Sequence, residues 1–174
     1  MPCFNIKNKK YIISDDYNNS RSAWILPLEE ETKQLILDFT ILWNMVEHQV
    51  YNDSFDRFEK TTNCINMVIG LKDSDIKINN VYNIFKEYIS KYNSNELFYE
   101  DFHFGNSRIK LEEIKQLLFS NDNSDKLKLL IYSCYRVRCN FFHGPKCIFD
   151  LNNQQLLFYS LNELLSLISK SYGM

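Results

Sequence analysis

Glycine and proline are scarce in this sequence, which has four glycines and three prolines in 174 residues. Folds built from many tight turns need more of both, so the scarcity favours long helices over a β-sandwich. Paired cysteines are also missing, because none of the five cysteines forms a C-x-x-C motif. An odd, scattered set without a secretory signal is typical of reduced intracellular thiols, and we expect a cytoplasmic protein.

Long apolar runs and a large excess of either charge are absent as well. No uninterrupted run approaches the roughly 18 apolar residues of a membrane-spanning helix, and the N-terminal MPCFNIKNKK lacks the apolar core of a signal peptide. We therefore expect no membrane association. The formal net charge of -2 argues against a surface coated with nucleic-acid-binding charge, although a local basic patch is compatible with it.

Helical periodicity is what the sequence has in abundance. Apolar residues recur at three- and four-residue spacing over 27–51, 53–71, 75–92, 111–119, 125–142 and 152–170. Four long helices with lesser ones make an all-α, antiparallel helical bundle the most economical fold. We assign residues 27–174 to this bundle. Residues 1–26 form an N-terminal arm, in which two β-prone runs suggest a short hairpin or an extended segment.

The spacing also predicts which residues face the core. The helix over 75–92 should bury Ile78, Val81, Phe85, Tyr88 and Ile89, and the helix over 152–170 should bury a face with Leu157, Leu161, Leu164, Leu165 and Ile168. The helix over 53–71 should bury Phe55, Phe58, Thr62, Ile65 and Ile69. The helix over 125–142, with Ser124 as its N-cap, should bury Leu127, Leu130, Cys134, Val137 and Phe141. Gly144 and Pro145 should end the helix over 125–142.

The stretch YRVRCNFFHGPK stands at the end of that helix and concentrates groups that can act on a phosphate. The basic residues between 126 and 149 are Lys126, Lys128, Arg136, Arg138 and Lys146, and no Asp or Glu lies among them. Such a segment predicts a local basic patch that can hold RNA. Arginine grips phosphate oxygens in bidentate fashion, and histidine exchanges protons near neutral pH.

The spacing of Arg138 and His143 sets a geometric condition. Five residues correspond to about 140° around a helix, so the two do not share one face. A fraying helix end at the Gly144-Pro145 stop, or a two-fold homodimer that brings two copies together, would gather them. Asn140 lies three residues before His143 and can hydrogen-bond near it.

The segment from Arg138 to Gly144 resembles the R-x4-6-H motif of the HEPN superfamily (higher eukaryotes and prokaryotes nucleotide-binding domains). The resemblance covers the surrounding helices, roughly residues 124–171. It implies an α-helical bundle, often dimeric, and a metal-independent endoribonuclease of toxin–antitoxin, abortive-infection or CRISPR-linked defence systems. Cys139 departs from the Asn, Asp or His that often follows the arginine. Cys147 replaces the tyrosine of the members that pair with a nucleotidyltransferase.

The resemblance also implies roles for individual residues. Arg138 and His143 would be the catalytic pair and Asn140 a supporting residue. Arg136 fits the permissive spacing too, so either arginine can be the principal one. We expect Arg136, Lys146 and Lys128 to bind RNA. A polar residue from an early helix often approaches the motif in this family, which makes Glu47 a candidate supporting group. The alternative for Glu47 is a solvated helix face.

Other functions stay open at this point. Cys139, His143 and Cys147 have the form C-x3-H-x3-C, but a structural zinc site takes four ligands and no fourth is evident. We expect no metal and no cofactor. His103 could contact a base or a partner, and a loop histidine is the simpler interpretation. The partners expected are RNA, a second copy of the chain and a regulatory protein such as an antitoxin. The alternatives are a non-catalytic HEPN-like binding module and a plain helical domain in which His143 only caps its helix.

Overall fold

The computed structural model describes the backbone of residues 5, 6, 9, 10, 29–90, 98, 99, 102, 104, 109–143 and 151–174. The helices in this part of the chain are α2 (Glu30–Gln49), α3 (Glu59–Ile69), α4 (Ser74–Ser90), α6 (Leu111–Phe119), α7 (Asn123–His143), the short 3-10 helix η3 (Leu151–Gln154) and α8 (Gln155–Ser171). The prediction of an all-α fold is confirmed. Helices α2, α4, α6, α7 and α8 lie close to the ranges expected from periodicity, and α3 is shorter than expected.

A short hairpin is present in the N-terminal arm. Strands β1 (Asn5–Ile6) and β2 (Lys9–Lys10) pair antiparallel, with Asn5 opposite Lys10 and Ile6 opposite Lys9. Strand β2 thus consists of Lys9 and Lys10, which belong to the polar stretch KNKK (residues 7–10). From the sequence, this stretch was expected to separate the two β-prone runs. The remainder of the arm lies outside the described residues.

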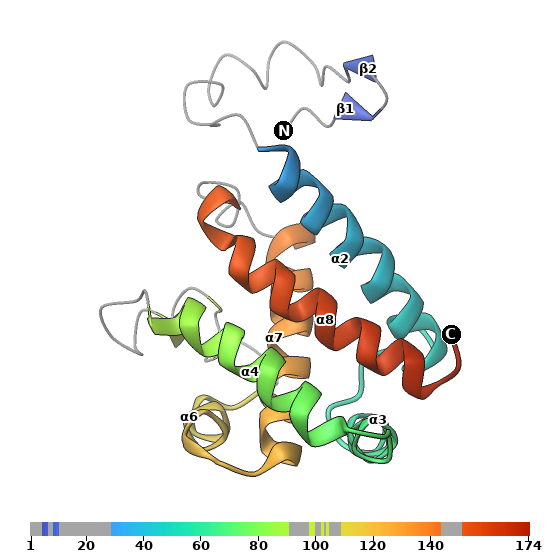
Figure 1. Ribbon diagram of the computed structural model, residues 1–174, viewed down its shortest axis with the longest axis vertical. Helices are drawn as coiled ribbons and strands as arrows, with labels where there is room; N and C mark the ends of the chain where they lie inside the picture. The colour runs from blue at the N-terminus through green and yellow to red at the C-terminus, as the bar shows by residue number, and fades with distance from the viewer. Residues whose placement is uncertain are drawn as a thin grey trace.

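Helices α2 and α8 lie side by side, with α7 behind them (Figure 1). They run in the same direction, because residues early in α2 bond residues early in α8. The side-chain amide of Gln155 donates to Thr32 Oγ1 at 2.9 Å, and that of Asn162 donates to the carbonyl of Leu35 at 2.9 Å. The expected antiparallel arrangement is therefore wrong for this pair. The chain rises through α7 and returns through α8, which leaves α8 parallel to α2.

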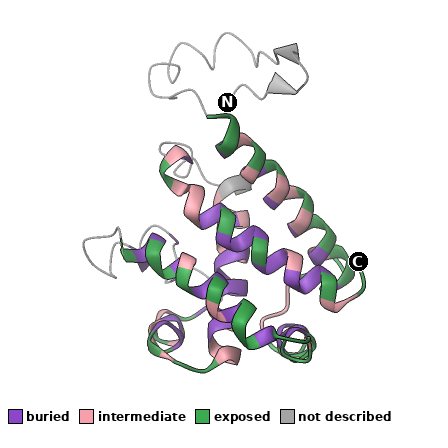
Figure 2. Cartoon of the chain, viewed as in Figure 1, coloured by how far each residue is buried: buried purple, intermediate pink, exposed green. Residues whose placement is uncertain are grey.

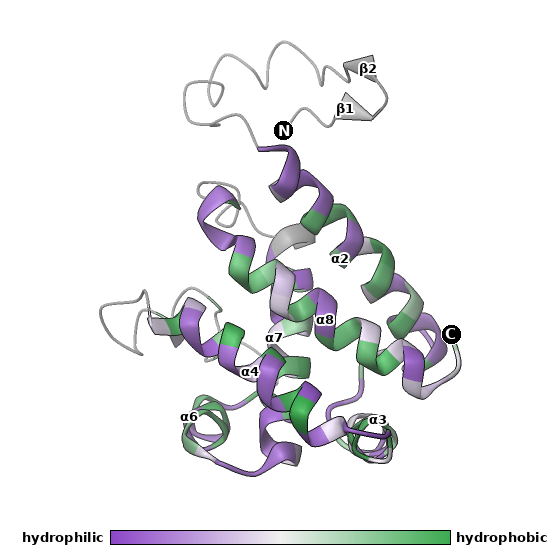
Figure 3. Ribbon diagram, in the orientation of Figure 1, coloured by the Kyte–Doolittle hydropathy of each residue, from purple (hydrophilic) through white to green (hydrophobic). Residues whose placement is uncertain are grey.

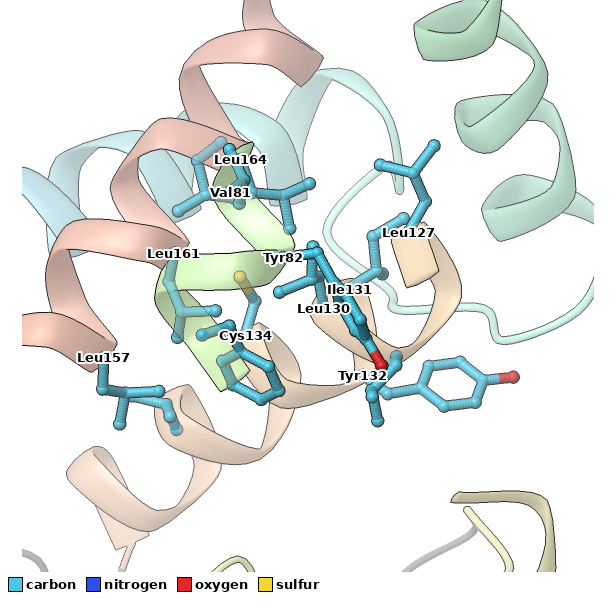
Figure 4. Packing of buried hydrophobic residues seen from close by; sticks show 14 of the residues in the cluster. Val81, Tyr82, Leu127, Leu130, Ile131, Tyr132, Cys134, Leu157, Leu161 and Leu164 are labelled. Carbon is cyan, nitrogen blue, oxygen red and sulfur yellow. The ribbon is translucent and has the colours of Figure 1, made fainter. Parts of the chain in front are cut away.

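The core is built around α7. Figure 4 shows Leu130 and Cys134 of α7 among side chains of α4 and α8. The predicted inward positions of α7 are buried at Leu127, Leu130, Cys134 and Val137. The side chain of Phe141 lies outside the described part. Burial follows one face of α4 and α8 as well (Figure 2), and the inward residues predicted there are buried.

The amphipathic pattern of the helices is visible in Figure 3, where hydrophobic and hydrophilic residues alternate along α2 and α8. This alternation is what a helix needs to pack one side on a core and expose the other. The described helices include none with both the length and the apolar character to cross a bilayer.

The prediction for α3 is wrong in its start and in part of its face. The helix begins at Glu59, and it buries Thr61, Cys64, Ile65 and Val68. Thr62, Ile69 and Phe58 are exposed. The preceding loop contains Asp56, whose carboxylate accepts the backbone N–H groups of Phe58 (2.9 Å) and Lys60 (3.1 Å). These bonds hold the pKa of Asp56 below its usual value and satisfy backbone donors that the first turn leaves unpaired.

Candidate functional site

The stretch that carries the motif forms the last turns of α7. The helix starts after Asp122, whose carboxylate caps the backbone N–H groups of Ser124 and Asp125, so Asp122 and not Ser124 occupies the capping position. At the other end, the backbone is helical through His143. The expected fraying at His143 is therefore not seen in its backbone. The His143 side chain and Lys146 lie outside the described residues.

Arg138 meets a carboxylate from a distant helix. Its terminal nitrogen lies 3.4 Å from Glu47 Oε2, and the exposed side-chain fractions are 29% for Arg138 and 13% for Glu47. The same carboxylate oxygen accepts the indole N–H of Trp43 at 2.9 Å. Trp43 is fully buried, so its indole fixes the position of the Glu47 carboxylate that Arg138 approaches. The interpretation of Glu47 as a solvated helix position is wrong.

Arg136 makes a different set of contacts. Its Nε donates to the backbone carbonyl of Phe102 at 2.8 Å, and a terminal nitrogen donates to Asn140 Oδ1 at 3.3 Å. Asn140 was expected to support Arg138 and His143, whereas this contact links it to Arg136. The four-residue spacing of Arg136 and Asn140 explains the contact, because such residues are neighbours on a helix surface.

Helix geometry separates the two arginines. Two residues correspond to about 200° around an α-helix, so Arg136 and Arg138 leave α7 on nearly opposite sides. His143 follows Arg136 by seven residues, which is about two turns. The backbone of His143 thus lies on the side of Arg136 and Asn140, and Arg138 faces Glu47 on another side.

The basic residues at the start of α7 do not form the open patch that the sequence indicated. Lys126 is 9% exposed, and its ammonium group donates to Asn79 Oδ1 at 2.8 Å. Lys128 lies 2.7 Å from Glu113, a residue of α6. The segment from Lys126 to Lys146 contains no Asp or Glu, but the fold brings Glu113 of α6 next to it. Lys126 belongs to the packing between α4 and α7, and Lys128 keeps part of its side chain exposed.

Glu113 is the centre of a polar cluster on this side of α7. Besides Lys128, it accepts the phenol O–H of Tyr132 at 3.2 Å and lies 3.8 Å from Arg57. Burial raises the pKa of Tyr132, which keeps the phenol protonated and able to donate. Arg57 comes from the loop before α3, so the cluster joins that loop to α6 and α7.

An aromatic cluster connects the loop to the motif. Phe55 stacks on Tyr135 with ring centroids 4.1 Å apart and planes 12° apart. Tyr135 precedes Arg138 by three residues, and its ring lies 6.5 Å from that of Trp43. From the sequence, Trp43 was expected to be a core or interface residue, which its burial confirms, and neither Trp43 nor Tyr135 was expected at the candidate site. The four-residue spacing of Trp43 and Glu47 was the signal that could have found the first of them.

The remaining candidates are the cysteines around the motif and the loop residue His103. Among the described residues, no three His, Cys, Asp or Glu side chains gather in a way that could hold a metal ion. Cys139 is a free, partly exposed thiol. Cys147 and His103 lie outside the described residues.

Comparisons of the chain with protein-family models, with curated proteins and with solved structures found no significant match.

Proposed function

We propose that this chain is a metal-independent endoribonuclease of HEPN type that acts in a toxin or defence system. The observation that carries the proposal is the pairing of Arg138 with Glu47, beside the last turns of a helix that ends at His143. It supplies an oriented cation on the same helix as His143, a residue type that exchanges protons near neutral pH, although the two leave α7 on different sides. The resemblance of this stretch to the R-x4-6-H motif supplies the reaction class.

The proposed reaction is an attack of the RNA 2′-hydroxyl on the adjacent phosphorus. A bond forms between the 2′-oxygen and phosphorus, and the bond from phosphorus to the 5′-oxygen breaks. A base takes the proton of the 2′-hydroxyl, and an acid gives a proton to the leaving 5′-oxygen. His143 acts in proton transfer. The products carry 2′,3′-cyclic phosphate and 5′-hydroxyl ends.

Arg138 holds the scissile phosphate in this proposal. Negative charge builds on the phosphate oxygens in the transition state, and a preorganised guanidinium stabilises it. Glu47 acts as a positioning residue, because Trp43 anchors the same carboxylate oxygen that approaches Arg138. The Arg138–Glu47 separation of 3.4 Å is long for a charge-assisted hydrogen bond, so a phosphate oxygen can compete for the guanidinium.

Arg136 and Asn140 belong to a second group of side chains in the proposed site. Their mutual contact places them on the side of α7 where the backbone of His143 lies. We assign Asn140 to orienting the neighbouring polar groups and Arg136 to binding RNA next to the cleaved bond. A two-fold homodimer would bring the Arg138 side of one copy toward the His143 side of the other. The site is then shared between two chains, and a partner protein such as an antitoxin restrains it.

The test is cleavage of mixed RNA in the presence of EDTA. The wild-type chain should cut RNA and leave cyclic phosphate ends, and His143→Ala should lose at least about a hundredfold in rate, because general acid–base catalysis contributes about 10²–10⁴-fold. End-group analysis of the products and gel quantification measure both. Equal cleavage by His143→Ala and wild type would contradict the assignment.

The second candidate function is a non-catalytic module that binds RNA or a protein. The contacts of Arg136 with Phe102 and Asn140 favour it, since an arginine held in this way also positions a binding surface. This function predicts no cleavage, and loss of RNA or partner binding when Arg136 and Arg138 are both changed to Glu. In a plain helical domain, Arg138→Ala would leave RNA binding and oligomeric state unchanged.

A further inference from the structure

The loop between α2 and α3 presents an aromatic ring to solvent. Phe58 is 66% exposed, although it directly precedes α3, a helix that packs one face on the core. The guanidinium of Arg57 lies over this ring, with its central carbon 4.5 Å from the ring centroid. The pair therefore combines an exposed aromatic ring with a positive charge stacked on one of its faces.

The loop that carries this ring is tied down on both sides. Asp56 bonds the backbone N–H of Phe58, and the hydroxyl of Thr61 donates to the carbonyl of Asp56 at 2.6 Å. The phenol oxygen of Tyr132 on α7 lies 3.3 Å from the carbonyl oxygen of Arg57, which shares the one phenol proton with Glu113. An exposed ring on a well-anchored backbone loses little conformational freedom when a ligand stacks on it.

The same loop leads to the proposed cleavage site. Phe55 stacks on Tyr135, and Tyr135 lies one helical turn before Arg138. Tyr132, which contacts Arg57, is six residues before Arg138, or about 9 Å along the helix axis. Lys128 and Arg57 share the carboxylate of Glu113 beside this path. Along α7, the partly exposed cations Lys128 and Arg138 thus lie on either side of Tyr132 and Tyr135, of which Tyr132 is buried.

We infer that Phe58 and Arg57 form a stacking site for a base of single-stranded RNA whose backbone runs along α7 toward Arg138. The inference rests on the proposed function and names the form of its substrate. Proteins that hold single strands combine cations that follow the backbone with exposed rings on which bases stack. The exposed residues near Phe58 in the sequence are polar or charged: Asn52, Asp53 and Ser54 of the loop, and Glu59 at the start of α3. An apolar protein contact would require a wider hydrophobic patch around the ring.

The experiment measures binding in a His143→Ala background, so that no cleavage is needed. The probes are a fluorescently labelled single-stranded RNA and an abasic strand of the same length. Phe58→Ala should lower affinity for the RNA about tenfold, as expected for loss of one base–aromatic stack, and should leave the abasic strand unaffected. Phe58→Trp should retain the affinity of the parent. Thermal unfolding of each variant verifies that the fold is kept.

Phe119→Ala is the matched control, because Phe119 is also a strongly exposed phenylalanine, at 73%, and lies at the end of α6. It should bind both strands as the parent does. The inference is overturned if Phe58→Ala binds RNA like the parent, or if the RNA and the abasic strand weaken equally. If Phe58→Ala instead releases a protein partner and not RNA, the loop is a protein-binding surface. The two proposals can fail separately. Cleavage that depends on His143 can be observed even if Phe58 does not bind RNA, and loss of RNA binding in Phe58→Ala can be observed even if the chain does not cleave RNA.

Discussion

The two ends of α7 carry similar basic residues in different surroundings. Near its start, Lys128 lies 2.7 Å from Glu113, a carboxylate that also takes a hydrogen bond from Tyr132 and an ion pair from Arg57. Near its end, Arg138 lies 3.4 Å from Glu47, whose other bond comes from Trp43. The first carboxylate joins three elements of the fold. The second holds one arginine in place.

This difference leads us to expect different roles for the basic residues at the two ends of α7. A cation that shares its carboxylate with other cations contributes to packing and, under the proposed function, to the attraction of RNA, but its position is not set by that contact alone. A cation beside a largely covered carboxylate that a second group anchors is preorganised, which is what stabilisation of a transition state requires. We therefore expect substitutions at the start of α7 to change stability and affinity. Substitutions at its end should change the rate of the chemical step.

The largest expected effect is that of Arg138→Gln on turnover. Loss of one preorganised charge-stabilising group costs about a hundredfold in rate, so the turnover number should fall by that factor while the Michaelis constant changes little. Initial-rate measurements over a range of RNA concentrations separate the two. An unchanged turnover number would remove Arg138 from the catalytic group and transfer its role to Arg136.

A smaller effect is expected from Glu113→Ala on stability. Lys128, Arg57 and the phenol of Tyr132 lose their common acceptor. Because the groups are partly exposed, the free energy of unfolding should fall by about 2 kcal/mol. For a domain of this size, that lowers the melting temperature by roughly 4–8 °C in calorimetry.

The neighbouring Glu112→Ala is the control for this change, because Glu112 is exposed and should melt like wild type. Turnover at saturating RNA should be the same in both variants. A large loss of turnover with Glu113→Ala would mean that the two ends of α7 are coupled.

The smallest effect is that of Lys128→Gln on RNA affinity. Removal of one phosphate contact weakens binding a few-fold and makes the slope of log affinity against log salt less negative by about 0.7 for a single strand. Fluorescence anisotropy at several salt concentrations measures the slope. Lys170→Gln, at an exposed position in the last turn of α8, should leave it unchanged. If Lys128→Gln instead lowered the turnover number and left the affinity intact, the roles assigned to the two ends of α7 would be wrong.

Sequence periodicity predicted the fold where local pattern and core face agree. The residues that it placed on the inward faces of α4 and α8 are buried, as are Leu127, Leu130, Cys134 and Val137 of α7, although it did not include the buried Tyr82 of α4 and Phe158 of α8. It was wrong at α3, because Phe55 and Phe58 continue an apolar spacing through a segment whose backbone is held as a loop by Asp56. Spacing alone does not distinguish an exposed aromatic residue from a buried one.

The candidate site was predictable in its residues and not in their partners. Arg136, Arg138, Asn140 and His143 stand out by type and spacing, and helix geometry already showed that Arg138 and His143 point to different sides. The pairing of Asn140 with Arg136, and the anchoring of Glu47 by Trp43, depend on which side of α7 faces which neighbour. That orientation is set by packing of the whole bundle.

The sequence by itself determined the helices and the faces of α4, α7 and α8, because helical periodicity and burial are local properties that neighbouring residues encode together. Only the tertiary structure decided the charge environment of the basic residues. Glu47 reaches Arg138 across 91 positions of sequence, and Glu113 reaches Lys128 from another helix. Electrostatic interactions depend on distance in space, so a stretch without acids in the sequence gains its carboxylates when the chain folds.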